Sequence, residues 1–147
     1  MSDPTPSTPS ENGARTHLIP GFEIEGLVGK GGMGAVYRAR KLNIGKTVAL
    51  KVLFPSLAED PVYAERFERE VRSLARLTHE NLVNVLDAGR AGDFRYMVMD
   101  FVEGHNLADV VAARGPLPPE QIGSVAEQAL LGLQFIHEQG MVHRDLK

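Results

Sequence analysis

A glycine-rich stretch between two extended segments constrains this chain more than any other feature. The stretch reads Gly29-Lys30-Gly31-Gly32-Met33-Gly34. Before it, residues 21–28 alternate apolar and acidic side chains, and after it residues 35–41 form a second strand-like run. Glycine lacks a Cβ and permits φ > 0, so such a loop can close on a ligand and offer it N–H groups. Phosphate is the usual ligand, although a GxGxxG match alone is weak evidence.

The segment after the loop separates two kinds of glycine-rich site. In dinucleotide-binding folds the last glycine opens a helix that crosses over to a parallel strand. Here only residues 35–42 separate Gly34 from the turn Asn43-Ile44-Gly45. A parallel crossover needs about a dozen residues or more, so the spacing favours a β-hairpin and disfavours a dinucleotide site.

A lysine and a glutamate occupy positions that the apolar pattern assigns to the interior. A strand predicted over residues 46–53 places Lys51 on the same face as Ala49. A helix predicted from Asp60 to about residue 77 carries Glu70 on its apolar stripe. Either charge could reach solvent independently, but both are costly to bury alone. Their joint occurrence predicts an ion pair that places an ammonium group beside the phosphates of a nucleotide.

The rest of the chain predicts two more strands and two more helices. The strands are expected over residues 82–88 and 95–102, joined by a turn through Gly89 and Gly92-Asp93. Asn106 can cap a helix over residues 107–113, and Gly140 can end a long helix over residues 119–139. The apolar stripe of the long helix consists of Ile122, Ala126, Ala129, Leu133 and Ile136. Since few partners for this stripe are encoded, we expect it to be exposed.

Residues 1–19 differ in composition from the rest of the chain. Pro4, Pro6 and Pro9 alternate with serines and threonines, and there is little to bury. This composition predicts a disordered leader. Its role is open between an inert leader and a segment that is phosphorylated or docks.

Composition excludes several function classes. The net charge of −3 gives no reason to expect nucleic acid as a partner. The absence of cysteine excludes disulfides. No apolar run approaches the ~20 residues of a membrane span, and the N-terminus lacks a signal pattern, so we expect a cytoplasmic protein.

The sequence resembles the N-terminal part of a protein kinase catalytic domain, most closely the eukaryotic-like Ser/Thr kinases of bacteria. Four motifs carry the resemblance in order: GxGxxGxV over residues 29–36, Val48-Ala49-Leu50-Lys51, Glu70, and His143-Arg144-Asp145. The resemblance implies an α+β fold, with a five-stranded antiparallel sheet and one helix in the N-lobe and hinge (residues 20–102). Residues 103–147 would be the incomplete start of the C-lobe.

The resemblance also implies roles for particular residues. The residues that it places around ATP are Val28, Gly29, Lys30, Gly31, Gly32, Met33, Gly34, Val36, Ala49, Lys51, Met99, Asp100 and Val102. Lys51, fixed by Glu70, would hold the α- and β-phosphates. Asp145 would be the catalytic base or orient the substrate hydroxyl, and Lys147 would touch the γ-phosphate, as in kinases that phosphorylate protein Ser and Thr.

The implied cofactors are ATP and Mg²⁺, but the Asn and the Asp-Phe-Gly motif that hold Mg²⁺ in this family do not occur after Asp145. No metal ligand is therefore assigned, and we expect residues 1–147 alone not to catalyse phosphoryl transfer. The alternative is a truncated pseudokinase that binds nucleotide or a second kinase as a partner.

Overall fold

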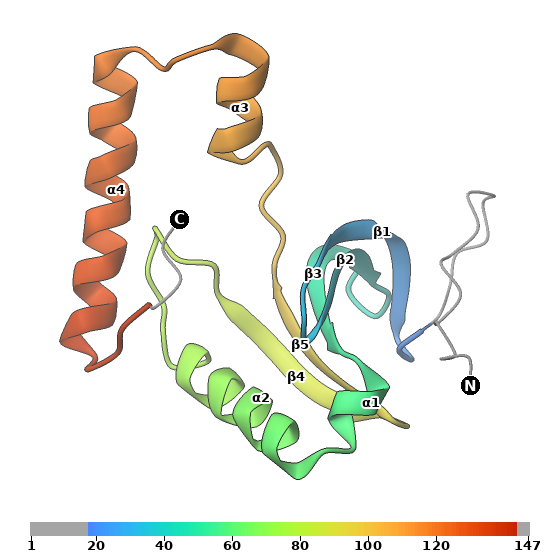
Figure 1. Cartoon of the computed structure of the whole chain (residues 1–147). Helices are drawn as coiled ribbons and strands as arrows, with labels where there is room; N and C mark the ends of the chain where they lie inside the picture. The colour runs from blue at the N-terminus through green and yellow to red at the C-terminus, as the bar shows by residue number, and fades with distance from the viewer. Residues whose placement is uncertain (1–17, 144–147) are drawn as a thin grey trace.

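The computed structural model describes residues 18–143, which form a twisted sheet with two helices packed on it and two helices beyond it (Figure 1). The elements in chain order are β1 (Phe22–Lys30), β2 (Gly34–Lys41), β3 (Lys46–Leu53), α1 (Pro55–Ala58), α2 (Pro61–Leu74), β4 (Val85–Ala91), β5 (Phe94–Asp100), α3 (Leu107–Arg114) and α4 (Pro119–Glu138). The five-stranded sheet has the order β1-β2-β3-β5-β4. Every neighbouring pair is antiparallel, which confirms the predicted fold class.

The glycine-rich stretch is the turn of a β-hairpin, as the spacing predicts. β1 pairs with β2 from Phe22 opposite Lys41 to Lys30 opposite Ala35. Register shifts occur between Ile24 and Gly26 and again after Leu27. These bulges interrupt the simple alternation expected over residues 21–28, because each extra residue reverses the faces that follow it.

Gly34 is required by close packing of the hairpin against β3. A Cβ at this position would lie 2.1 Å from the carbonyl oxygen of Val52. Its backbone is not left-handed, and neither is that of Gly29, Gly31 or Gly32, so the loop does not use the φ > 0 that its glycines permit. Left-handed glycines lie instead in turns, as at Gly92 (φ 56°) between β4 and β5.

The core has two parts, one on each face of the sheet. On one face a buried cluster contains Ile19, Phe22, Ala39, Val48, Leu50, Val52 and Val98. On the other face, Leu53 and Met97 pack against Phe67 of α2. β3 is therefore buried on both sides, and the alternation predicted for it is confirmed. Ile19 is fully buried although it falls in the predicted leader, whose residues 1–17 lie outside the described residues.

Several boundaries differ from the predictions. α2 ends at Leu74 rather than near residue 77, and the short helix α1 was not predicted. Asp60 caps α2 as expected, since its carboxylate accepts the N–H of Val62 at 2.8 Å. Gly89 lies inside β4 rather than in the turn. Glycine is required at this position for packing and not for a turn, because a Cβ there would lie 2.5 Å from the hydroxyl of Tyr96 on the paired strand.

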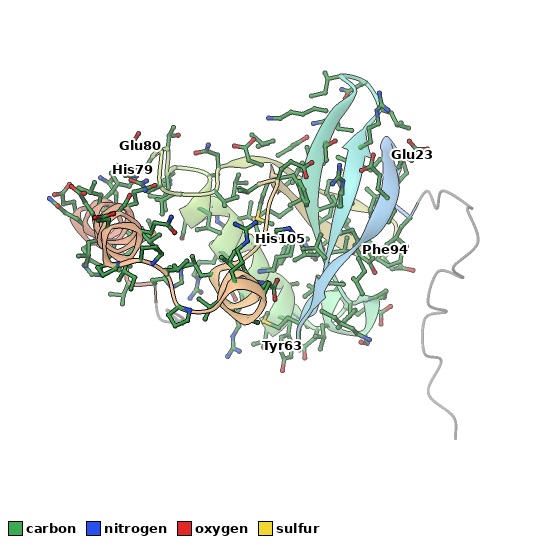
Figure 2. All side chains as sticks on the ribbon, turned by 90° about the horizontal axis from the view of Figure 1, so that it is seen from above. Glu23, Tyr63, His79, Glu80, Phe94 and His105 are labelled. Atoms are coloured by element: carbon green, nitrogen blue, oxygen red, sulfur yellow. The ribbon has the colours of Figure 1, made fainter. Side chains whose placement is uncertain are left out.

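The C-terminal helices extend away from the sheet (Figure 1). α4 contacts the segment between α2 and β4, which carries His79 (Figure 2). The ring centre of Phe135 in α4 lies 5.0 Å from that of His79. The predicted stripe of α4 is covered at Ile136 but exposed at its beginning, where Ile122 is 52% exposed. Asn106 caps α3 through the N–H of Asp109 at 2.8 Å. Within residues 18–143 no helix combines the length and apolar character needed to cross a membrane.

Replacing Gly34 by alanine should destabilise the protein, because the added methyl would overlap the Val52 carbonyl and push β2 from β3. The expected loss is about 1–3 kcal/mol in the free energy of unfolding, measured by urea denaturation of residues 1–147. Gly31→Ala is the matched control, since its Cβ would meet nothing within 4 Å and its φ is not left-handed. Equal unfolding midpoints for the two variants would contradict this account.

Candidate functional site

An ion pair joins the centre of the sheet to α2. The Nζ of Lys51 in β3 lies 2.6 Å from Oε1 of Glu70, as predicted from the sequence. Phe67, one turn earlier on α2, is buried between helix and sheet and sets the height of Glu70 above the strand. The two side chains are 30% and 39% exposed, so a ligand can still reach them. A pair this exposed contributes only about 0–1 kcal/mol to stability, and its importance is positional.

The strand register gathers the apolar candidates on the face that carries Lys51. Val36 lies opposite Lys51 across the β2–β3 pair, and Gly29 lies opposite Val36. Ala49, two residues before Lys51, lies opposite Met99 of β5. Because directly paired residues and residues two apart share a face, Val36, Ala49 and Met99 form an apolar surface beside the ammonium group.

Backbone hydrogen bonds fix the base of the glycine-rich loop, and no other part of the described chain packs against three of its glycines. The N–H of Gly31 donates to the carbonyl of Gly34 at 2.9 Å, and the carbonyl of Met33 accepts the N–H of Phe54 at 3.1 Å. A Cβ on Gly29, Gly31 or Gly32 would meet no atom within 4 Å. Nothing in the described chain therefore requires glycine at these three positions, whereas a ligand lying against the backbone would.

Two sequence-predicted residues of this site are largely exposed. Val28 is 57% exposed. It lies in the second register shift, between Leu27 and Gly29, and has no paired residue on β2. Val102 is 69% exposed and follows the end of β5. Lys30 lies with its ammonium 5.4 Å from the ring centre of Phe54 rather than toward Lys51.

β5 ends at Asp100, whose carboxylate and backbone N–H are both hydrogen-bonded within the protein. Its carboxylate accepts hydrogen bonds from Lys46 Nζ and from Asn84 Nδ2, each at 2.9 Å. The bond from Lys46, followed by that from Asn84, lowers the pKa of the Asp100 carboxyl below its ordinary value. Its backbone N–H donates to the carbonyl of Asn84 at 3.0 Å. What Asp100 can offer a ligand is thus its backbone carbonyl.

Arg38 organises the edge of the site, and sequence reasoning missed it. Its guanidinium pairs with Glu25 at 2.8 Å and with Glu103 at 3.1 Å, and it lies 5.0 Å from the ring centre of Phe101. The hydrogen bond to Glu25 is the main cause of a raised pKa for Arg38. Through these two ion pairs the Arg38 guanidinium joins β1 and β2 to the segment that follows β5. The signal lies in strand register, because Glu25 neighbours Arg38 only once the bulge beside Gly26 is known.

The last candidates lie outside the described residues. Asp145 and Lys147 follow the end of the described range, so their proposed roles remain predictions. Between residues 18 and 143 there is no group of three or more His, Asp or Glu side chains that could hold a metal ion.

Comparison with known proteins places this geometry in a family. Residues 22–147 match the protein kinase domain. The chain is 40% identical over 135 residues to serine/threonine-protein kinase PknB of Mycobacterium leprae, covering 89% of this chain and 22% of that protein. It is 42% identical over 126 residues to serine/threonine-protein kinase pkn2 of Myxococcus xanthus, covering 86% of this chain and 15% of that protein.

Solved structures of protein kinases are similar to this chain as well. The PknI kinase domain of Mycobacterium tuberculosis superimposes with a TM-score of 0.72 at 30% identity, covering 92% of this chain and 56% of that one. Rad53 1-466 in complex with AMP-PNP gives a TM-score of 0.75 at 32% identity, covering 86% of this chain and 33% of that one. The chain thus spans about half or less of these proteins. The chain therefore belongs to the protein kinase domain family.

Proposed function

We propose that residues 20–102 form the N-lobe and hinge of an ATP-dependent protein serine/threonine kinase and that residues 103–147 begin its C-lobe. The observation that carries this proposal is the 2.6 Å ion pair between Lys51 and Glu70, placed beside an apolar face and an open glycine-rich loop. Family membership and the relatives named serine/threonine-protein kinases support the reaction class.

In this proposal the phosphates of ATP lie between the loop and Lys51. The ammonium group has three N–H donors, and its contact with Glu70 leaves others to bind α- and β-phosphate oxygens. Glycines at 29, 31 and 32 let the backbone approach those oxygens without a side chain intervening. The pair with Glu70 also holds Lys51 in one conformation, which reduces the ordering cost of binding the phosphates.

The adenine ring would lie on the apolar face. Val28, Val36 and Ala49 would form an apolar roof over the ring, and Met99 lies opposite Ala49 across the β3–β5 pair. Val28 is expected to lose exposed surface when the ring binds. The backbone of Val102 and the carbonyl of Asp100 would bind the edge of the ring by hydrogen bonds. Arg38 holds this segment against the sheet through Glu103 and Phe101.

In the complete enzyme a Ser or Thr hydroxyl oxygen attacks the γ-phosphorus while the bond to the β–γ bridging oxygen breaks and ADP leaves. We assign Asp145 the role of orienting that hydroxyl and accepting its proton. Lys147 would stabilise negative charge on the transferred group. Mg²⁺ bound with ATP would neutralise part of the phosphate charge, and no residue of this chain is assigned to hold it.

Replacing Lys51 by methionine should weaken nucleotide binding, because the ammonium donors to the phosphates are lost. We expect a decrease of about tenfold or more in the affinity of residues 1–147 for ATP, or about 1.4 kcal/mol, by isothermal titration calorimetry. Lys41→Met is the matched control: this lysine also pairs with a carboxylate, Asp87, at 2.8 Å, but away from the site. Unchanged affinity in Lys51→Met would rule out the assigned role.

The second candidate is a pseudokinase that binds nucleotide or a partner without phosphoryl transfer. We expect purified residues 1–147 to bind ATP without transferring its γ-phosphate to a general protein substrate such as myelin basic protein. Radiolabelled ATP provides the assay, with a complete kinase as the positive control. Clear Mg-ATP-dependent incorporation that disappears in Asp145→Asn would show that this fragment is itself an active enzyme.

A further inference from the structure

Arg38 lies on the face of the sheet that is proposed to bind the nucleotide. It is opposite Ala49 in the β2–β3 pair, and the next row of that pair with the same orientation joins Val36 to Lys51. β5 ends at Asp100, so the chain leaves the sheet at the end that is nearer to Arg38 than to Lys51. Arg38 therefore lies toward the proposed position of the base, and Lys51 lies toward that of the phosphates.

The connector, which we define as residues 101–105, runs from the end of β5 toward α3 (Figure 1). It belongs to no helix or strand. It contains Val102, whose backbone is assigned to the edge of the adenine ring. A segment outside regular structure keeps conformational freedom that it loses when a ligand binds to it. Contacts that hold the connector before the nucleotide arrives therefore lower the entropy cost of binding the base.

The side chain of Arg38 contacts the connector on both sides of Val102. Its Nη1 and Nη2 lie 3.2 and 3.1 Å from the two carboxylate oxygens of Glu103. Its guanidinium carbon lies 5.0 Å from the ring centre of Phe101. A third contact, from Nε to the carboxylate of Glu25 at 2.8 Å, holds the guanidinium on the β1–β2 hairpin. The arginine therefore joins the hairpin that covers the base to the segment that meets its edge.

These contacts lie at the surface of the protein, so their effect is limited in size. The side chains of Arg38 and Glu103 are 41% and 67% exposed. Isolated ion pairs with this exposure contribute little. A two-pronged contact between an arginine and a carboxylate, within a network of further contacts, is the geometry in which surface pairs are effective. We therefore expect loss of Arg38 to change binding a few-fold and to leave the fold intact.

The backbone from Asp100 to Val102 is the part of the proposed site that can distinguish one base from another. Adenine presents an amino donor at N6, where guanine presents the acceptor O6. The carbonyl of Asp100 can accept a hydrogen bond from the amino group but not from O6. Holding this backbone in position strengthens the matched bond and gives nothing to the mismatched base. Discrimination between the bases therefore increases when the connector is fixed.

We propose that Arg38 is a positioning residue that increases the preference of the site for ATP over GTP. Through Glu103 and Phe101 it fixes the backbone that meets the base, and it acts without touching the nucleotide. The inference rests on the proposed function for the placement of the base. It goes beyond that function because ATP binding by Lys51 and the glycine-rich loop does not itself require an arginine at position 38.

The test compares the affinities of residues 1–147 for ATP and for GTP in the presence of Mg²⁺. Both are measured by displacement of a fluorescent ATP analogue, so that weak binding of GTP is also measurable. We expect Arg38→Ala to weaken ATP binding about threefold and to change GTP binding by less than about twofold. Lys51→Met should instead weaken the binding of both nucleotides by the same factor, because their phosphates are identical.

Matched variants show whether Arg38 acts through the connector. Glu103→Gln should also weaken ATP binding, and its effect should not add to that of Arg38→Ala, because both variants remove the same contact. Arg38→Lys keeps the charge but loses the two-pronged geometry, so it should restore only part of the preference for ATP. Asp87→Asn is the control: it removes a carboxylate that pairs with Lys41 at 2.8 Å elsewhere on the sheet, and both affinities should stay unchanged.

Equal weakening of ATP and GTP binding by Arg38→Ala would overturn the inference, because a general loosening of the hairpin does not depend on the base. Additive effects of Arg38→Ala and Glu103→Gln would overturn it as well. If Lys51→Met weakens ATP binding but Arg38→Ala leaves the ratio of the two affinities unchanged, only this inference is rejected. If neither nucleotide binds to the unaltered chain, or Lys51→Met has no effect, the proposed function is rejected and this inference falls with it.

Discussion

The proposed nucleotide site of this protein depends on the contact between Lys51 and Glu70. The lysine comes from β3, the strand in the middle of the sheet, and the glutamate comes from α2, which packs on that sheet. Since the pair is partly exposed, it adds little to stability, and its geometry is imposed by the packing of Phe67 between α2 and the sheet. Small displacements of α2 would therefore break the contact without unfolding the protein. Such a contact suits a site that is regulated through the position of a helix.

The glycines of the loop fall into two groups with different physical causes. Gly34 is fixed by the fold, because the Val52 carbonyl occupies the place of a side chain. Gly29, Gly31 and Gly32 face open space in a backbone that any residue could adopt. No packing contact of the described residues explains their presence, whereas the proposed nucleotide would, because a ligand against the backbone would exclude side chains.

Local and nearest-neighbour features were predictable from the sequence, and long-range ones were not. The hairpin followed from chain length after Gly34, and the ion pair followed from two charges on apolar faces. The bridge from Arg38 to Glu25 and Glu103 depends on strand register and a bulge, which no local pattern specifies. The same holds for Gly89, where a side chain is excluded by the ring of Tyr96 on the neighbouring strand. Tertiary contacts that cross strands require the register to be known first.

A double-mutant cycle on ATP affinity tests the central claim most directly. Lys51→Met, Glu70→Gln and the double variant are compared with the unaltered chain by calorimetry, and Glu65→Gln on the exposed side of α2 is the control. If Glu70 acts by holding Lys51, the double variant should bind ATP no more weakly than Lys51→Met, with a coupling energy of about 0.5–3 kcal/mol. Strictly additive losses, or equal effects of Glu70→Gln and Glu65→Gln, would contradict the account.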